Sequence, residues 1–232
     1  MSYQNLHKRM MTNFTCLNLR RNPVLRTCTS VTARRKVIEQ YSLFPKDIVR
    51  LLTLAQNAAR AHGCMHMADE LTRNIGEELG TETDGVTHYQ LLGQALKHEI
   101  ALDVGLIRPE PATVTFLASI QKNLAQKLMP GVFGAVYAME LSAVPELRVV
   151  LRLLTQLKAQ TIPGKLGTNA QTFFHLHLAV WEPDHDHCLR AVESEVLRTP
   201  ADHVGFEQSF FAVIAAMETW WHDLAQLANQ NT

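Results

Sequence analysis

Residues 173–187 read Phe-Phe-His-Leu-His-Leu-Ala-Val-Trp-Glu-Pro-Asp-His-Asp-His, and they are the most informative part of the chain. It places four of the chain's eleven histidines and three carboxylates in an otherwise apolar helical sequence. A solvent-exposed helix needs no such pattern. Imidazoles and carboxylates at about one-turn spacing are typical of a transition-metal site inside a helical bundle, because imidazole nitrogen and carboxylate oxygen suit Fe, Mn or Zn. The stretch therefore predicts a metal-binding bundle with further ligands elsewhere in the chain.

A second pair of candidate ligands lies upstream, at a predicted turn between two helices. Residues 74–80 read Asn-Ile-Gly-Glu-Glu-Leu-Gly, and His88 follows Glu78 by ten positions. Gly80 predicts the end of the first helix, and Thr83 or Asp84 is the predicted N-cap of the next. This arrangement places Glu78 near the end of one helix and His88 near the start of its neighbour.

A third feature is the lone carboxylate of Glu140 in the apolar helical stretch 131–143. A buried carboxylate that is charged and unpaired costs several kcal/mol, so Glu140 needs a metal or a basic partner. Arg148 is the nearest candidate for such a basic partner. Both interpretations of Glu140 remain open on the residues alone.

In this order, the three features resemble those of the heme-oxygenase-like diiron oxidases and oxygenases, and the resemblance covers roughly residues 20–230. It implies an all-α fold, a single bundle of about seven core helices related to heme oxygenase and thiaminase-type proteins. It also implies two non-heme irons in place of heme, with Glu140 as the candidate bridge between them. The ligands that the resemblance implies are Glu78, His88, Glu140, His177, Glu182 and His185.

The last group of ligands departs from the family pattern of His, three residues, Asp, two residues, His. Here Trp181 occupies the acid position after His177. Allowing one inserted residue restores the order with Glu182 and His185. In a regular helix Glu182 would lie about 140° from His177, whereas a π-bulge would bring it back to about 40°.

Pro183 favours such a bulge, because its ring lacks an amide donor and clashes with the carbonyl group of Ala179. The competing register uses Asp184 and His187, which are also three residues apart. We favour the register of Glu182 and His185. His175 and His187 are then interpreted as nearby or solvated histidines.

Composition is consistent with one helical domain and excludes several other classes. The chain of 232 residues is 47% hydrophobic and carries a net charge of zero, which argues against binding to nucleic acid. No apolar run reaches the roughly 18–20 residues of a membrane span, so no membrane partner is expected. The four cysteines form no Cys-x-x-Cys pair, which favours a reducing, cytoplasmic location.

The N-terminal segment is basic, with eight Lys or Arg and no acidic residue up to Lys36. Such a composition suits either a transit peptide or a part of the fold. We favour a basic extension over residues 1–15 and a helical domain over residues 16–232. Apolar spacing of three and four predicts helices at 31–44, 45–61, 65–79, 86–102, 112–128, 132–143, 145–160, 169–197 and 201–229. Glu82, Asp84, His98, Glu99 and Asp103 are assigned to loops or helix surfaces.

The resemblance implies an enzyme that uses O2 to oxidise a small metabolite in a biosynthetic pathway. An amino acid or amine, fragmented or N-oxygenated, is the favoured substrate, and Arg148 and Arg152 are candidates to bind its carboxylate. Tyr137 and Trp181 are candidate pocket residues, although a role as plain core aromatics is equally open. The alternatives are oxidative decarboxylation of a fatty acid, a metal-free thiaminase-like or cofactorless enzyme of the same fold, and a helical interaction protein. A homodimer remains open.

Overall fold

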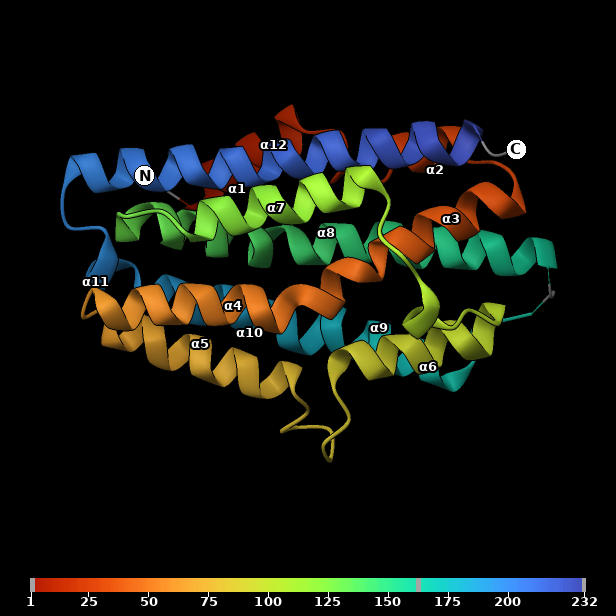
Figure 1. The fold of residues 1–232 in the computed structure, drawn as a ribbon, viewed down its shortest axis with the longest axis horizontal. Helices are drawn as coiled ribbons and strands as arrows, with labels where there is room; N and C mark the ends of the chain where they lie inside the picture. Colours follow the sequence, from red (N-terminus) through yellow and green to blue (C-terminus); the bar gives the residue numbers. More distant parts are fainter. Residues whose placement is uncertain (1–2, 162–163, 231–232) are drawn as a thin grey trace.

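The computed structural model describes residues 3–161 and 164–230, and every regular element in these ranges is helical, which confirms the all-α prediction (Figure 1). The elements are α1 (Tyr3–Asn13), α2 (Pro23–Thr27), α3 (Val31–Tyr41), α4 (Leu43–Ala61), α5 (Met65–Glu78), α6 (His88–Ile100), the 3-10 turn η1 (Val104–Leu106), α7 (Pro111–Leu124), α8 (Met129–Thr161), α9 (Thr168–Leu176), the π-helical turn η2 (His177–Trp181), α10 (Glu182–Ala191), α11 (Glu193–Val196) and α12 (Pro200–Gln230).

The long helix α8 runs through the middle of the bundle (Figure 1). On one side it packs along α12, and this is the most extensive helix pair in the described chain. Gly134 allows the close approach, since a Cβ atom there would lie 2.2 Å from the carbonyl oxygen of Phe206. On the other side lie α4, α5 and α6, with α9 behind α6 and α10 behind α4 (Figure 1). The candidate ligands come from α5, α6, α10, the π-helical turn and α8.

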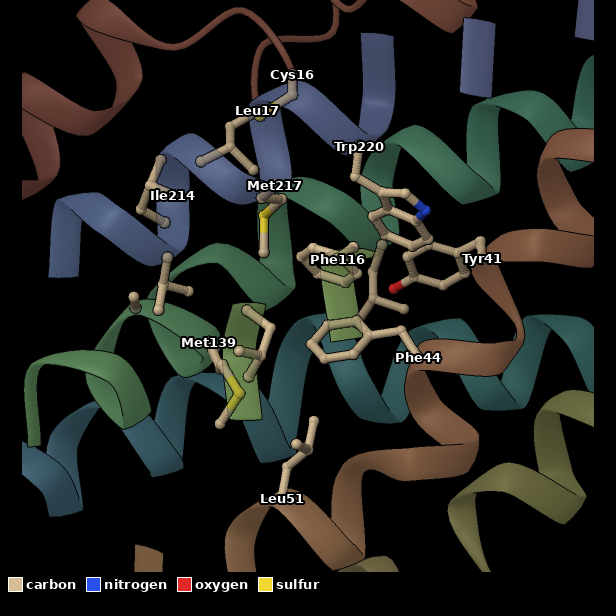
Figure 2. Packing of buried hydrophobic residues seen from close by; sticks show 14 of the residues in the cluster. Cys16, Leu17, Tyr41, Phe44, Leu51, Phe116, Met139, Ile214, Met217 and Trp220 are labelled. Atoms are coloured by element: carbon tan, nitrogen blue, oxygen red, sulfur yellow. The ribbon is translucent and has the colours of Figure 1, made fainter. Parts of the chain in front are cut away.

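Aromatic side chains fill the core between α12, α7 and the start of α4 (Figure 2). Phe116 stacks on Trp220 with ring centroids 4.2 Å apart and planes at 3°. Phe44 meets Phe116 edge-on at 5.3 Å, a preferred geometry for aromatic pairs. Tyr41 and Phe44 also line the cavity described below, so the core fixes one wall of the candidate site.

The predicted break between helices 132–143 and 145–160 was wrong, because α8 continues through Pro145. Proline removes one amide donor from the ladder and clashes with the preceding turn. In α8 this local cost is offset by packing, since most of the helix is buried against α12, α3, α7 and α10. As a result Glu140 and Glu146 belong to one continuous helix.

The N-terminal residues lie against the bundle. Residues 3–13, which the sequence assigned to a basic extension, form α1, and Leu6 and Met10 on it are buried in the shared core. Arg9 pairs with Glu207 of α12 at 2.8 Å. Within residues 3–161 and 164–230, no helix combines the length and the apolar character that a membrane span requires.

Candidate metal centre

The turn between α5 and α6 brings Glu78 and His88 together. Gly80 adopts a φ of 95°, and its amide donates to the carbonyl oxygen of Glu77 at 2.8 Å, while the amide of Thr81 donates to that of Gly76 at 3.1 Å. These two bonds are those of a Schellman motif, and they confirm Gly80 as the helix stop.

The start of α6 differs from the prediction, because Thr87 and not Thr83 or Asp84 is its N-cap. The Thr87 hydroxyl accepts a hydrogen bond from the backbone amide of Gln90. In return, the side-chain oxygen of Gln90 accepts one from the backbone amide of Thr87. This reciprocal capping box sets the first helical residue at His88. It leaves His88 Nδ1 3.3 Å from Glu78 Oε1.

His88 is a buried imidazole without hydrogen bonds. Its side chain stacks on Trp181 with ring centroids 3.9 Å apart and meets His177 edge-on at 4.7 Å. The 3.3 Å approach of Glu78 lacks hydrogen-bond geometry, so neither ring nitrogen of His88 has a hydrogen-bond partner among the described residues. Buried polar atoms are nearly always paired, so the two ring nitrogens of His88 fit the role of metal ligands.

The π-bulge predicted near Pro183 is present as the π-helical turn at residues 177–181. His177 opens this turn, is buried, and places Nδ1 2.8 Å from the carbonyl oxygen of Phe173. A proton on Nδ1 donated to that oxygen leaves Nε2 with a free lone pair. Burial, assisted by the nearby His88, lowers the pKa of His177 to about 3, so the imidazole stays neutral, as a metal ligand must be.

The candidate ligands Glu78, His88, Glu140, His177 and His185 are called the cluster below. Within it, His185 and Glu140 are in contact. His185 is buried, with Nδ1 3.1 Å from Glu140 Oε2. The other carboxylate oxygen of Glu140 accepts from Nδ2 of Asn74 at 2.9 Å. Arg148, which the sequence offered as a partner of Glu140, is exposed. Glu140 is therefore held by an amide and an imidazole from other helices.

The two residues of the competing register, Asp184 and His187, are exposed. Asp184 has a side chain that is 54% exposed and lies 3.0 Å from Nη1 of Arg73. His175 is also exposed. The side chain of Glu182, one of the six predicted ligands, lies outside the described residues.

Glu77 is a buried neighbour of the cluster that the sequence reasoning missed. Its Oε2 lies 2.7 Å from His185 Nε2, and its Oε1 accepts from Arg73. Burial alone would raise the pKa of Glu77, but the contacts with His185 and Arg73 outweigh it and hold the pKa below its usual value. The signal was available in the sequence, since Asn74, Glu77 and Glu78 follow the three- and four-residue spacing of one helix face.

A cavity of about 70 Å³ opens beside the cluster, and four of the predicted ligands line it. Among the described residues, the lining is Tyr41, Phe44, Pro45, Ile48, Glu78, His88, Met139, Glu140, Ala143, Glu146, Leu147, Phe173 and His177. Apolar side chains form most of its wall. Arg148 and Arg152 are exposed and do not line it.

The two candidate pocket aromatics lie outside the cavity lining. Tyr137 is fully buried among Phe133, Phe206 and Phe210, and its hydroxyl accepts from Nε of Arg190 at 3.3 Å. Trp181 covers His88 instead, and its indole N–H donates to Glu82 Oε2 at 2.8 Å.

The candidate ligands are of residue types that suit iron, but in this structure several of them contact one another. In the described part of the chain, no group of three or more His, Cys, Asp or Glu has its ligand atoms already converged on one point. The reason is visible at His185, whose two ring nitrogens face Glu77 and Glu140. The ring nitrogens of His88, which have no hydrogen-bond partner among the described residues, and the neutral imidazole of His177 fit a metal of the Fe, Mn or Zn type.

Comparison with known proteins places the chain in a family. Two crystal structures of a CADD-like protein of unknown function from Nostoc punctiforme resemble it closely. One has 30% sequence identity and a TM-score of 0.90, over 99% of this chain and 95% of that chain. The other has 31% identity and a TM-score of 0.91, over 97% and 96%. A comparison with curated proteins yields no match. The model of a family described as a domain of unknown function with a solved structure (DUF3865) matches residues 2–227, and the chain belongs to this family.

Proposed function

We propose that this protein binds two non-heme irons in the cluster and uses O2 to oxidise a small metabolite. The observation that carries the proposal is His88, a buried imidazole that lies beside Glu78 and His177 and has no hydrogen bond to either ring nitrogen from the described residues. Support also comes from the CADD-like fold, since CADD is a heme-oxygenase-like diiron protein family.

We assign Glu78 and His88 to one iron and His177, Glu182 and His185 to the other. Glu140, which lines the same cavity as Glu78, His88 and His177 and contacts His185, is the candidate ligand shared by both irons. Iron held by these residues would supply the electrons that reduce O2. The contacts of His185 with Glu77 and Glu140 would keep its ring oriented.

The surrounding residues position the ligands and exclude water. The carbonyl group of Phe173 fixes the tautomer of His177, and Asn74 orients Glu140. Trp181 covers one face of His88. The apolar wall beside the cluster, formed in part by Phe44, Ile48 and Leu147, holds the hydrocarbon part of a substrate.

The cavity favours a small substrate over a fatty acid. Its volume of about 70 Å³ suits a few heavy atoms, whereas a fatty acid requires a long apolar tunnel. The exposed positions of Arg148 and Arg152 also remove the candidate partners for a substrate carboxylate. An amine is therefore favoured over an amino acid.

Anaerobic titration with Fe(II) tests the proposal, followed by rapid mixing with O2. We expect about two irons per chain and a transient visible absorption after O2 is added. His88→Ala should remove about one iron, whereas His98→Ala, whose exposed imidazole lies on the same helix, should remove none. Carefully loaded protein that retains no iron and is silent toward O2 would refute the proposal.

A further inference from the structure

Glu146 is a buried carboxyl group at the cavity that the proposed iron ligation does not use. It lies on α8, six residues after Glu140, is 1% exposed and lines the cavity. Its Oε1 accepts from the indole N–H of Trp221 at 2.9 Å. No Lys, Arg or His of residues 3–161 and 164–230 forms an ion pair with it.

The charged groups around the cavity are unbalanced. Among the described residues, three carboxyl groups line it, those of Glu78, Glu140 and Glu146, and no Lys or Arg does. The proposed irons neutralise Glu78 and Glu140. This would leave Glu146 without a cation. Ionising a buried carboxyl group whose hydrogen-bond donor is the neutral indole of Trp221 costs free energy that a ligand with positive charge would recover.

We propose that Glu146 binds the ammonium group of a small apolar amine, whose hydrocarbon part packs against Phe44, Ile48 and Leu147. A charge-assisted hydrogen bond in a desolvated cavity selects an amine over a neutral molecule of the same shape. The inference rests on the proposed function only in naming this amine as the substrate.

The pH dependence of binding distinguishes an amine from a carboxylic acid as the ligand of Glu146. Burial raises the pKa of Glu146 to about 8, and the Trp221 hydrogen bond offsets only a part of that increase. An ammonium ligand requires the ionised carboxylate, so its affinity rises as the pH approaches 8. A carboxylate ligand would require the protonated form, and its affinity would fall over the same interval. The other titratable groups that line the cavity are Tyr41, Glu78, His88, Glu140 and His177.

Calorimetry with propylamine, 1-propanol and butyrate tests the inference on iron-loaded and on metal-free protein. We expect propylamine to bind at least tenfold more tightly than the alcohol or the acid at pH 8. Glu146→Gln should reduce the affinity for the amine to that for the alcohol. Glu193→Gln, on α11 and outside the cavity lining, should leave it unchanged. The indole N–H resonance of Trp221 in metal-free protein should shift with the amine.

The inference is overturned if Glu146→Gln changes the affinity for propylamine less than twofold, or if propanol or butyrate binds as tightly. If the Gln variant does not fold, the pH series on the unaltered protein decides, since only an amine gains affinity from pH 6 to 8. Failure of the protein to take up iron would refute the proposed function, while the amine measurement on metal-free protein would still decide the role of Glu146.

Discussion

His185 joins two carboxylates from different helices, with Nε2 2.7 Å from Glu77 on α5 and Nδ1 3.1 Å from Glu140 on α8. This contact depends on the π-helical turn at residues 177–181, which advances α10 by one residue relative to a regular helix. His187, two positions later, is exposed. The inward position therefore belongs to the register that contains His185.

His185→Ala should remove about one iron per chain, because the imidazole that contacts Glu140 is lost. His187→Ala should leave the iron content near that of the unaltered protein, since this side chain is exposed. Metal analysis after gel filtration measures both. Stoichiometry is the better readout, because loss of a supporting residue can itself weaken metal affinity 10- to 100-fold.

Glu182 and Asp184, both on α10, provide a second pair of variants. Glu182→Ala should lower the iron content, whereas Asp184→Ala breaks an exposed ion pair with Arg73 and should leave it intact. Loss of iron on changing Asp184 and His187, with retention on changing Glu182 and His185, would show that the register is wrong.

Glu146 should make the free energy of unfolding fall as the pH rises. The unfolded chain releases this proton near pH 4.5, whereas the folded protein keeps it until about pH 8. The contribution of Glu146 to the free energy of unfolding is therefore fully present below pH 4.5. It decreases by about 1.4 kcal/mol per pH unit between pH 4.5 and 8. Glu146→Gln should flatten this slope between pH 5 and 8 in urea unfolding of metal-free protein. Parallel slopes for the two proteins would contradict the assignment.

Lys158 neutralises the fully buried Glu99, which also accepts from the amide of Gly167 at 2.6 Å. Lys158→Met would leave this buried carboxylate without its Lys partner, with the Gly167 amide and the exposed His98 as its remaining contacts, which should cost about 3–5 kcal/mol of stability. Lys36→Met removes a partly exposed ion pair with Glu110 and should cost about 1 kcal/mol or less. Equal losses in denaturant unfolding of the two variants would refute a special role for the buried pair.

Local signals predicted much of the fold and of the site. Gly80 marked the end of α5, and Pro183 marked the π-helical turn, because each residue acts on its own backbone. The spacing of apolar residues located most helices within a few positions. These features need no knowledge of distant contacts.

Non-local contacts account for the errors. Glu99 was assigned to a surface, but Lys158, 59 residues away, pairs with it in the interior. Pro145 suggested a break, but packing holds α8 continuous. Glu77 was passed over because only the tertiary fold places His185 beside it.

A crystal structure of iron-loaded protein, with anomalous scattering recorded at the iron edge, would locate the metal. We expect two iron peaks about 3.5–4 Å apart, one beside Glu78 and His88 and one beside His177 and His185, with Glu140 between them. Absence of iron from this cluster in crystals grown from fully loaded protein, or a single iron bound elsewhere, would contradict the proposal.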